Sequence, residues 1–260
     1  MANNLKMKYS SPDSYIQSIV LKWPYTIMAM VLIAFLSGYF LYTSLSEYKI
    51  LLAMLQAVDA RAMLVLNFDG GAVADRFFYN YSQLRSWIPL SAALVGYTVF
   101  WHQGSWRERL GLVLVIAAML TFTDQLSSGI IKPLAARPRP SHNLLLAPML
   151  HYVNGYHGGQ YGFVSGHATN ICCLVTFLGY LYRNKIMRAV LAAFAVTICY
   201  SRIYLGVHYL GDILCGALLG IVVARVVIAL CPPRLLQRHD RCPVGVVAVW
   251  LGTMAVLLFV

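Results

Sequence analysis

Three short blocks of the sequence carry side chains that could bind a phosphate and transfer it. The blocks are Lys132-x6-Arg139-Pro140, Ser165-Gly166-His167 and Ser201-Arg202-x5-His208-x3-Asp212. Together they offer three cations, two histidines, one carboxylate and hydroxyl groups. A phosphate carries up to about two negative charges and three acceptor oxygens, so binding it takes donors from several directions. The set as a whole predicts phosphate chemistry.

Five of these residues suit the binding of the phosphate itself. Lys132, Arg139 and Arg202 would supply the positive charge, and each guanidinium is a planar fork that can bind two oxygens at once. Ser165 and Gly166 stand where an apolar run begins, so we expect a helix N-terminus there, with free backbone N–H groups. Glycine at that point lets an anion approach the backbone closely.

The two histidines and Asp212 suit the transfer step. His208 and Asp212 are four residues apart, which on a helix places them on one face, one turn apart. A carboxylate on one ring nitrogen fixes the tautomer and leaves the other nitrogen free to attack phosphorus. His167 is the remaining titratable group, and we expect it to protonate the leaving oxygen and then to activate water. The hypothesis is a two-step displacement through a phosphohistidine, with no metal or other cofactor.

The composition predicts that these blocks belong to a membrane protein. Of the 260 residues, 60% are apolar and only 11% are charged, against about 25% charged residues in a typical soluble domain. Apolar runs recur along the chain, and a run of about 20 residues can cross a hydrocarbon core of about 30 Å. Because backbone polar groups must pair internally in lipid, these spans should be helical. We predict an all-α, polytopic membrane helix bundle.

The apolar runs divide the chain into expected elements. Six spans are expected at residues 24–45, 87–101, 110–131, 164–182, 186–203 and 207–230. Residues 50–66 mix apolar and charged positions, which favours an amphipathic helix lying in the membrane interface. Residues 132–163 are expected to form a long polar loop, and residues 244–260 are a short candidate for a seventh span. The domain boundaries expected are a tail at 1–23, a membrane domain at 24–230 and a basic turn with the extra run at 231–260.

The charges set the orientation and argue against nucleic acid as a partner. With the N-terminus in the cytoplasm, 12 of the 20 cations and three of the nine acids fall on the cytoplasmic side. This distribution follows the positive-inside rule, so the net charge of +11 needs no nucleic acid to explain it. The same orientation places all three blocks on the non-cytoplasmic side. The six cysteines lack any C-x-x-C pair, and neither a metal nor a disulfide is expected from them.

Two further residues of the apolar runs could support the blocks. Asp124 lies within the third expected span, where a carboxylate is costly and usually has a partner. It would either support Lys132 or join two helices by a hydrogen bond, and the sequence leaves both interpretations open. Ser201 precedes Arg202 and is a candidate for a supporting role.

The three blocks resemble the type 2 phosphatidic acid phosphatase family, which shares its active site with vanadium haloperoxidases and bacterial acid phosphatases. The family pattern is Lys-x6-Arg-Pro, Pro-Ser-Gly-His and Ser-Arg-x5-His-x3-Asp, and here Val164 replaces the proline of the middle block. The resemblance covers roughly residues 124–230. It implies a six-helix core without a metal, His208 as nucleophile, Asp212 as its partner and His167 as acid. It also implies that Lys132, Arg139, Ser165, Gly166 and Arg202 bind phosphate.

The expected function is therefore that of a membrane lipid phosphatase with its site at the outer face of a bacterial inner membrane. The candidate substrates are undecaprenyl pyrophosphate, phosphatidylglycerophosphate, phosphatidic acid and the phosphates of lipid A, because the residues specify the phosphate and not the tail. One alternative is a phosphotransferase that uses the same pocket. A second is a non-catalytic protein that binds or flips lipids. Nothing in the sequence determines the oligomeric state.

Overall fold

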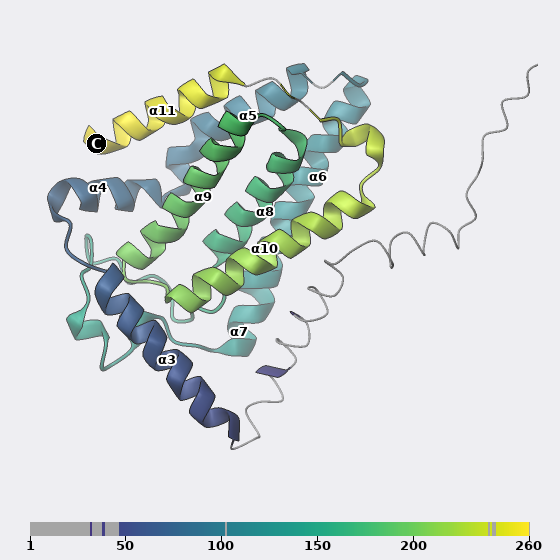
Figure 1. The fold of residues 1–260 in the computed structure, drawn as a ribbon. Helices are drawn as coiled ribbons and strands as arrows, with labels where there is room; N and C mark the ends of the chain where they lie inside the picture. The colour runs from purple at the N-terminus through teal and green to yellow at the C-terminus, as the bar shows by residue number, and fades with distance from the viewer. Residues whose placement is uncertain are drawn as a thin grey trace, which may run out of the picture. The chain divides into compact units, whose positions relative to one another are not determined.

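Figure 1 shows the fold of the chain as a computed structural model. It describes residues 47–259 except 102, 239, 241 and 242, together with the isolated helical residues 32, 38 and 39. The expected N-terminal tail, and the first expected span apart from those three residues, lie outside the described part. Residues 46–260 form one compact unit, and the description below concerns that unit.

Helices make up almost all the regular structure of the described residues. The α-helices are α3 (Glu47–Leu66), α4 (Gly71–Tyr81), α5 (Ile88–Trp101), α6 (Trp106–Asp124), α7 (Lys132–Ala135), α8 (Gly166–Leu181), α9 (Lys185–Tyr204), α10 (Leu210–Leu230) and α11 (Val244–Phe259). A π-helical segment, η3 (Gln125–Ile131), joins α6 to α7, and short 3₁₀ turns η2 (Leu84–Trp87), η4 (Pro140–His142), η5 (Ala147–Met149) and η6 (Pro233–Leu235) occur between helices. No β-strand occurs among the described residues, and the all-α prediction is confirmed.

Helix α8 lies at the centre of the bundle, between α6, α9 and α10 (Figure 1). Its closest neighbour is α10, where Gly216 and Gly220 face the α8 backbone. A Cβ atom at Gly216 would lie 2.7 Å from the carbonyl oxygen of Ser165, and one at Gly220 would meet the carbonyl of Thr169. Small residues therefore let the two backbones approach, as is common between helices in membranes.

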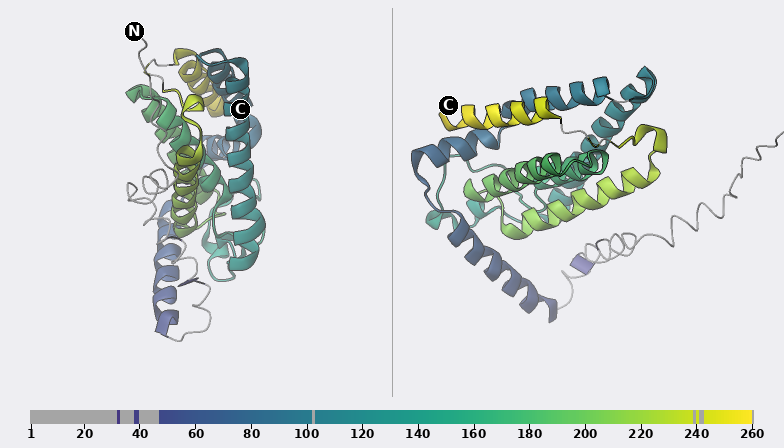
Figure 2. Two further views of the ribbon diagram at one scale, coloured as in Figure 1. Left: turned by 90° about the vertical axis from the view of Figure 1, so that its right-hand side faces the viewer. Right: turned by 45° about the horizontal axis from the view of Figure 1, so that its top comes forward.

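Three helical stretches of the described part are long and apolar enough to cross a membrane. They are Trp106–Ala135, Lys185–Tyr204 and Leu210–Leu230, while α8 and α11 are apolar but shorter. The 14 residues of α5 rise about 21 Å, which is shorter than the hydrocarbon core. Figure 2 shows α11 alongside α5, against which it packs. The chain is a multi-pass membrane protein.

The structure corrects one expected boundary and adds one helix. The third expected span ends at residue 131, but the helical path continues through Lys132 to Ala135, with Pro133 in the first turn of α7. Helix α4 was not expected. Its short sequence carries charges and no long apolar run, and it is held by tertiary packing of Phe78 against Tyr200 and Tyr204.

Helix α3 occupies the place expected for the interfacial helix, three residues longer at its start. It exposes large apolar side chains at Ile50, Leu51, Met54, Leu55, Val58, Leu64 and Val65. Met63, in contrast, is completely buried in a cluster with Ile203, Tyr209 and Ile213. The helix thus anchors to the ends of α9 and α10 by a narrow face, and its placement in the membrane interface stays a prediction.

Candidate functional site

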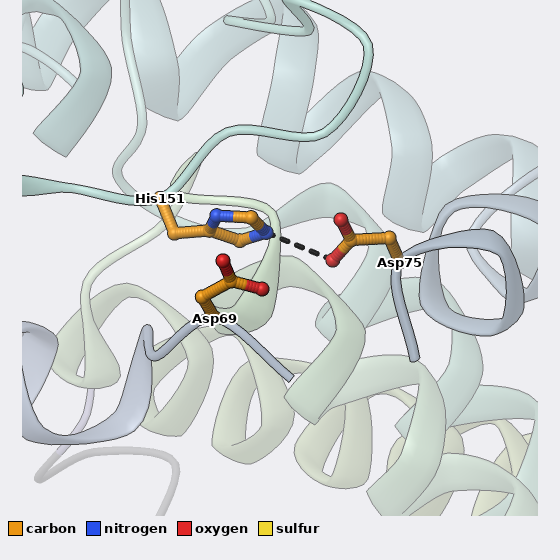
Figure 3. A group of neighbouring side chains, drawn as sticks. All are labelled: Asp69, Asp75 and His151. Carbon is orange, nitrogen blue, oxygen red and sulfur yellow. Dashed lines mark hydrogen bonds and ion pairs between the residues drawn. The ribbon is translucent and has the colours of Figure 1, made fainter. Parts of the chain in front are cut away.

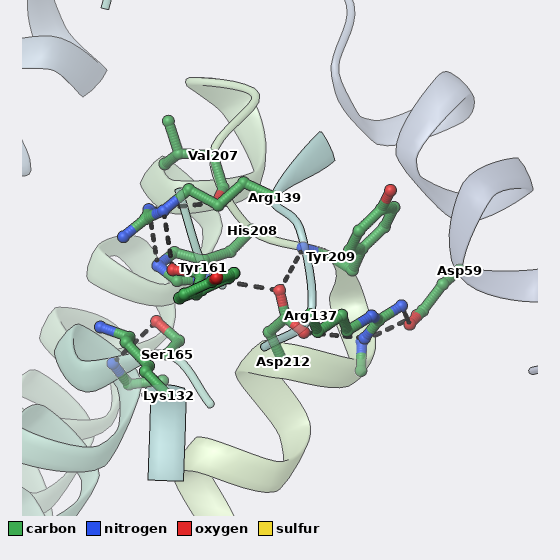
Figure 4. Close-up of polar contacts among 12 residues, drawn as sticks. Asp59, Lys132, Arg137, Arg139, Tyr161, Ser165, Val207, His208, Tyr209 and Asp212 are labelled. Carbon is green, nitrogen blue, oxygen red and sulfur yellow. Dashed lines mark hydrogen bonds and ion pairs between the residues drawn. The ribbon is translucent and has the colours of Figure 1, made fainter. Parts of the chain in front are cut away.

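The three blocks meet at one end of the bundle, where α7 ends, α8 and α10 begin and α9 ends (Figure 4). The N–H of Ser165 donates to the carbonyl of Asp212 at 3.0 Å, which joins the second block to the third. Arg139 lies 3.2 Å from His208, which joins the first to the third. The sequence analysis expected the three blocks to lie close together, and these contacts show that they do.

Lys132 directly follows the π-helical segment η3. Its ammonium donates to the hydroxyl of Ser128, one turn earlier, at 3.3 Å. A Cβ atom on Gly166 would lie 2.9 Å from that hydroxyl and 3.5 Å from the Lys132 Nζ. Gly166 therefore leaves room at the start of α8 for the Ser128 hydroxyl, which binds the lysine. Single π-turns of this kind are frequent at functional sites.

Arg139 is the cation in direct contact with the candidate nucleophile. Its Nε donates to the carbonyl of Tyr161 at 3.1 Å, and its Nη1 donates to the carbonyl of Val207 at 3.2 Å. The same Nη1 lies 3.2 Å from Nε2 of His208. Because a guanidinium can only donate, this contact assigns the lone pair to Nε2 and the proton to Nδ1 of the neutral ring.

His208 is 1% exposed and lies between Arg139 and Asp212 (Figure 4). Its Nδ1 stands 3.5 Å from Oδ2 of Asp212, longer than a good hydrogen bond, which is common at catalytic contacts before substrate binds. Burial, followed by the charges of Arg139, Arg202 and Lys132, holds the pKa of His208 well below its ordinary value. The imidazole is therefore neutral at pH 7, as a nucleophile must be.

Ser165 caps the helix that starts the second block. Its side chain accepts a bond from the N–H of Ala168, and the residue is completely buried. His167 follows on the first turn of α8, where its side chain is exposed to solvent. Arg202, His208 and Lys132 are the charged or titratable groups that act on it most strongly, so it lies beside the other two blocks.

Arg202 is buried in the last turn of α9. Its Nη2 donates to the hydroxyl of Tyr156 at 3.1 Å, and its guanidinium carbon lies 5.6 Å from the centre of that ring. Among the described residues, its Nε has no hydrogen-bond partner. A buried donor of this kind is free for an anion. Ser201, by contrast, turns its hydroxyl back to the carbonyl of Ile198 at 2.7 Å.

Asp124 lies between two helices, as one of the two interpretations expects. Its Oδ1 accepts a bond from the side chain of Asn170 on α8 at 3.3 Å, and Asn170 in turn accepts from Thr123. Its charge still acts on Lys132, although no hydrogen bond joins them. The carboxylate thus bridges α6 and α8 beside the lysine.

Two further charged residues, Asp59 and Arg137, join the site, although the sequence analysis did not place either among the site residues. Arg137 Nη1 donates to Oδ1 of Asp212 at 2.7 Å, and its Nη2 donates to Oδ2 of Asp59 at 2.7 Å. The guanidinium carbon also lies 4.2 Å from the centre of the Tyr209 ring. The position of Arg137, two residues before Arg139, was the only sequence signal for it, and Asp59 carried none.

A second histidine and aspartate cluster holds the corner between α3 and α4 (Figure 3). His151 pairs with Asp75 at 2.8 Å, and the carboxylate of Asp69 lies beside them, with one ligand atom from each residue within 4.8 Å of the others. The hydroxyl of Tyr204 also donates to Asp75, at 2.6 Å. Both contacts are to Oδ1 of Asp75, and the cluster joins the corner to the loop before α8 and to the end of α9.

Comparison with known proteins assigns the family. The PAP2 superfamily model matches residues 109–235, which include all three blocks. A lipid A 4'-phosphatase of Porphyromonas gingivalis is 36% identical over 65% of this chain and 71% of its own length. The chain belongs to the PAP2 superfamily.

Two further matches agree with this assignment. A lipid A 4'-phosphatase of Bacteroides thetaiotaomicron is 32% identical over 65% of this chain and 75% of its own length. The crystal structure of a transmembrane PAP2-type phosphatidylglycerolphosphate phosphatase from Bacillus subtilis has a TM-score of 0.54 and 21% identity, over 76% of this chain and 93% of that one. The structural likeness supports the fold, and the matches together support a membrane lipid phosphatase.

Proposed function

We propose that the protein removes a phosphate from a membrane lipid through a phosphohistidine on His208. The observation that supports this best is the surroundings of that ring. Its Nε2 faces Arg139 at 3.2 Å, its Nδ1 faces the buried carboxylate of Asp212, and burial and nearby cations keep it neutral. A neutral, oriented imidazole within a group of cations is what attack on a dianionic phosphate requires.

The first step transfers the phosphoryl group to the ring. Lys132, Arg139 and Arg202 bind the phosphate oxygens together with Ser165, Gly166 and the free N–H groups at the start of α8. Nε2 of His208 attacks phosphorus while the bond from phosphorus to the lipid oxygen breaks. His167 takes up a proton when the dianionic phosphate binds beside it, and it gives that proton to the lipid oxygen. Asp212 stabilises the positive ring that forms.

The second step returns the enzyme to its starting state. A water molecule attacks the phosphorus of the phosphohistidine, and the phosphorus–nitrogen bond breaks. His167 takes a proton from that water, so it regains the proton that it gave up in the first step. Inorganic phosphate leaves and His208 is neutral again. No metal ion takes part in either step of this proposal.

The proposed substrate is a lipid phosphate on the outer face of the inner membrane. The charge distribution of the sequence favours a cytoplasmic N-terminus and a site on the opposite side. Residues 24–230 form the proposed membrane domain, with the motifs within 124–230. Of the four candidate lipids, the phosphate of lipid A is favoured, because two relatives carry that activity in their names.

The test is phosphate release in detergent from a panel of the four candidate lipids, in the presence of EDTA. Wild type is compared with His208→Ala and with His151→Ala, which removes a histidine from the other histidine–aspartate pair. We expect release by wild type and His151→Ala, and a loss of at least about a thousandfold in His208→Ala. Rapid quenching with labelled substrate should trap an acid-labile phosphoenzyme in the two active proteins.

Three outcomes would count against the proposal. Activity that EDTA abolishes would exclude the metal-independent mechanism. Release that His208→Ala retains would exclude this nucleophile. A folded wild type that releases no phosphate but labels an added acceptor lipid would be a phosphotransferase instead.

A further inference from the structure

Helix α3 contributes a charged side chain to the catalytic end of the bundle. The side chain of Asp59 is only 14% exposed, although many of its neighbours on α3 are exposed. Its Oδ1 accepts a hydrogen bond from the backbone N–H of Gly211 at 2.8 Å. This N–H lies in the first turn of α10 and has no partner within the helix. Its Oδ2 accepts from Arg137 at 2.7 Å. Asp59 therefore joins α3 both to the first turn of α10 and to the loop before Arg139.

Arg137 holds two carboxylates at once. Its two terminal nitrogens donate to Asp59 and Asp212, each at 2.7 Å, and its planar group stacks on the ring of Tyr209. A guanidinium fixed at both ends and on one face has little freedom to rotate. The orientation of Arg137 is thus determined by Asp59, and it sets the position of Oδ1 of Asp212.

This arrangement leaves the other oxygen of Asp212 for His208. Oδ2 accepts from the N–H of Tyr209 at 3.0 Å and faces Nδ1 of His208. Asp212 is completely buried, and a buried carboxylate without a cation is costly. Among the described residues, Arg137 is the one arginine or lysine that forms a salt bridge with Asp212.

We propose that Asp59 and Arg137 are positioning residues that act through Asp212 to orient His208 for attack on phosphorus. The chain of contacts runs from Asp59 to Arg137, Asp212 and His208 in that order (Figure 4). The proposal rests on the function proposed above. It adds that an element outside the three blocks, α3, sets the geometry of the nucleophile.

The first test separates positioning from binding by the kinetics of the full-length protein in detergent. The substrate is lipid A, or whichever panel lipid wild type cleaves fastest. Asp59→Asn keeps an oxygen for Gly211 but loses the charge, and Arg137→Gln loses both ion pairs. We expect kcat to fall roughly 10- to 100-fold, as for other partners that orient a reacting group, with KM changed by less than about twofold.

Two more variants test the geometry while keeping the charges. Arg137→Lys retains the positive charge but lacks the fork, and we expect it to recover only part of the loss of Arg137→Gln. Gly211→Ala changes no charge, but its Cβ would lie 2.6 Å from Oδ2 of Asp59 and must displace it. We expect a loss of kcat similar to that of Asp59→Asn.

The matched control is Asp75→Asn, which removes a carboxylate from the His151 ion pair and leaves Asp212 untouched. We expect its kcat to equal that of wild type within about twofold. Melting curves of every variant verify the fold, and rapid quenching reports whether formation of the phosphoenzyme is the slowed step.

The outcomes distinguish the two proposals. If wild type releases no phosphate, the proposed function has failed. If wild type is active and His208→Ala is not, while folded Asp59→Asn and Arg137→Gln keep full kcat, the positioning role is wrong. A change of KM alone, or losses equal to that of Asp75→Asn, would also overturn it in favour of a structural ion pair.

Discussion

Within the described part of the chain, two histidine–aspartate pairs have different surroundings. His151 and Asp75 lie 2.8 Å apart with side chains 20% and 23% exposed, while His208 and Asp212 lie 3.5 Å apart and are almost completely buried. The shorter pair receives an additional bond from Tyr204, and its other neighbour is the carboxylate of Asp69. The longer pair is surrounded by cations. The charge around a pair, and not its length, therefore distinguishes a site for an anion from a structural clamp.

The largest expected difference between the pairs is in turnover. Asp212→Asn should lower kcat by roughly a thousandfold or more, because the amide no longer selects the tautomer that leaves Nε2 free to attack. Asp75→Asn should change kcat by less than about twofold. Steady-state phosphate release from the same lipid measures both. Comparable losses in the two variants would show that the comparison between the pairs is mistaken.

The next effect is on the pH dependence of the buried pair. The pKa of His208 lies well below the ordinary value of about 6.5, because of burial and then of Arg139, Arg202 and Lys132, with Asp212 on the other nitrogen. The neutral ring is the active form, so the acid limb of kcat/KM should lie below about pH 6.5, and an alkaline limb should report the loss of the proton from His167. The Arg139→Gln variant lacks one of these cations, so the pKa of His208 should rise. The acid limb of its residual activity should therefore move to higher pH.

A pH profile from about 4 to 9 for both proteins measures this shift. The reverse displacement, or an unchanged acid limb, would mean that another group controls the profile.

The smallest expected effect concerns stability at the exposed pair. His151→Ala removes a partly exposed ion pair worth at most about 1 kcal/mol, so the melting temperature should fall by roughly 2–4 °C with activity retained. A thermal melt in detergent, beside phosphate release, tests this. A large loss of activity without a change in melting temperature would make His151 part of the reaction and not of the clamp.

Much of the fold was predictable because apolar runs and turn residues are local signals. The expected helices within residues 50–66, 87–101, 110–131, 164–182, 186–203, 207–230 and 244–260 all occur, with ends shifted by a few residues. Helix α4 was missed because its stability comes from Phe78 and its aromatic neighbours on α9, which no local pattern reveals. The π-helical turn before Lys132 was missed for the same reason, since its residues fit an α-helix equally well.

In the candidate site, too, some features were predictable from the sequence and others were not. The composition and the three spaced blocks were enough to predict phosphate chemistry in a membrane protein, because they depend on residue types and short spacings. The expectation that His208 and Asp212 share one helix face was wrong, because His208 precedes α10 and only Asp212 lies in its first turn. Only the tertiary structure reveals that Asp59 and Arg137, 78 residues apart, join in one ion network with Asp212. Only it assigns the helix–helix bond of Asp124 and the inward hydroxyl of Ser201. Such contacts depend on how distant helices pack against each other, and a single contact between residues far apart in the sequence produces no local pattern.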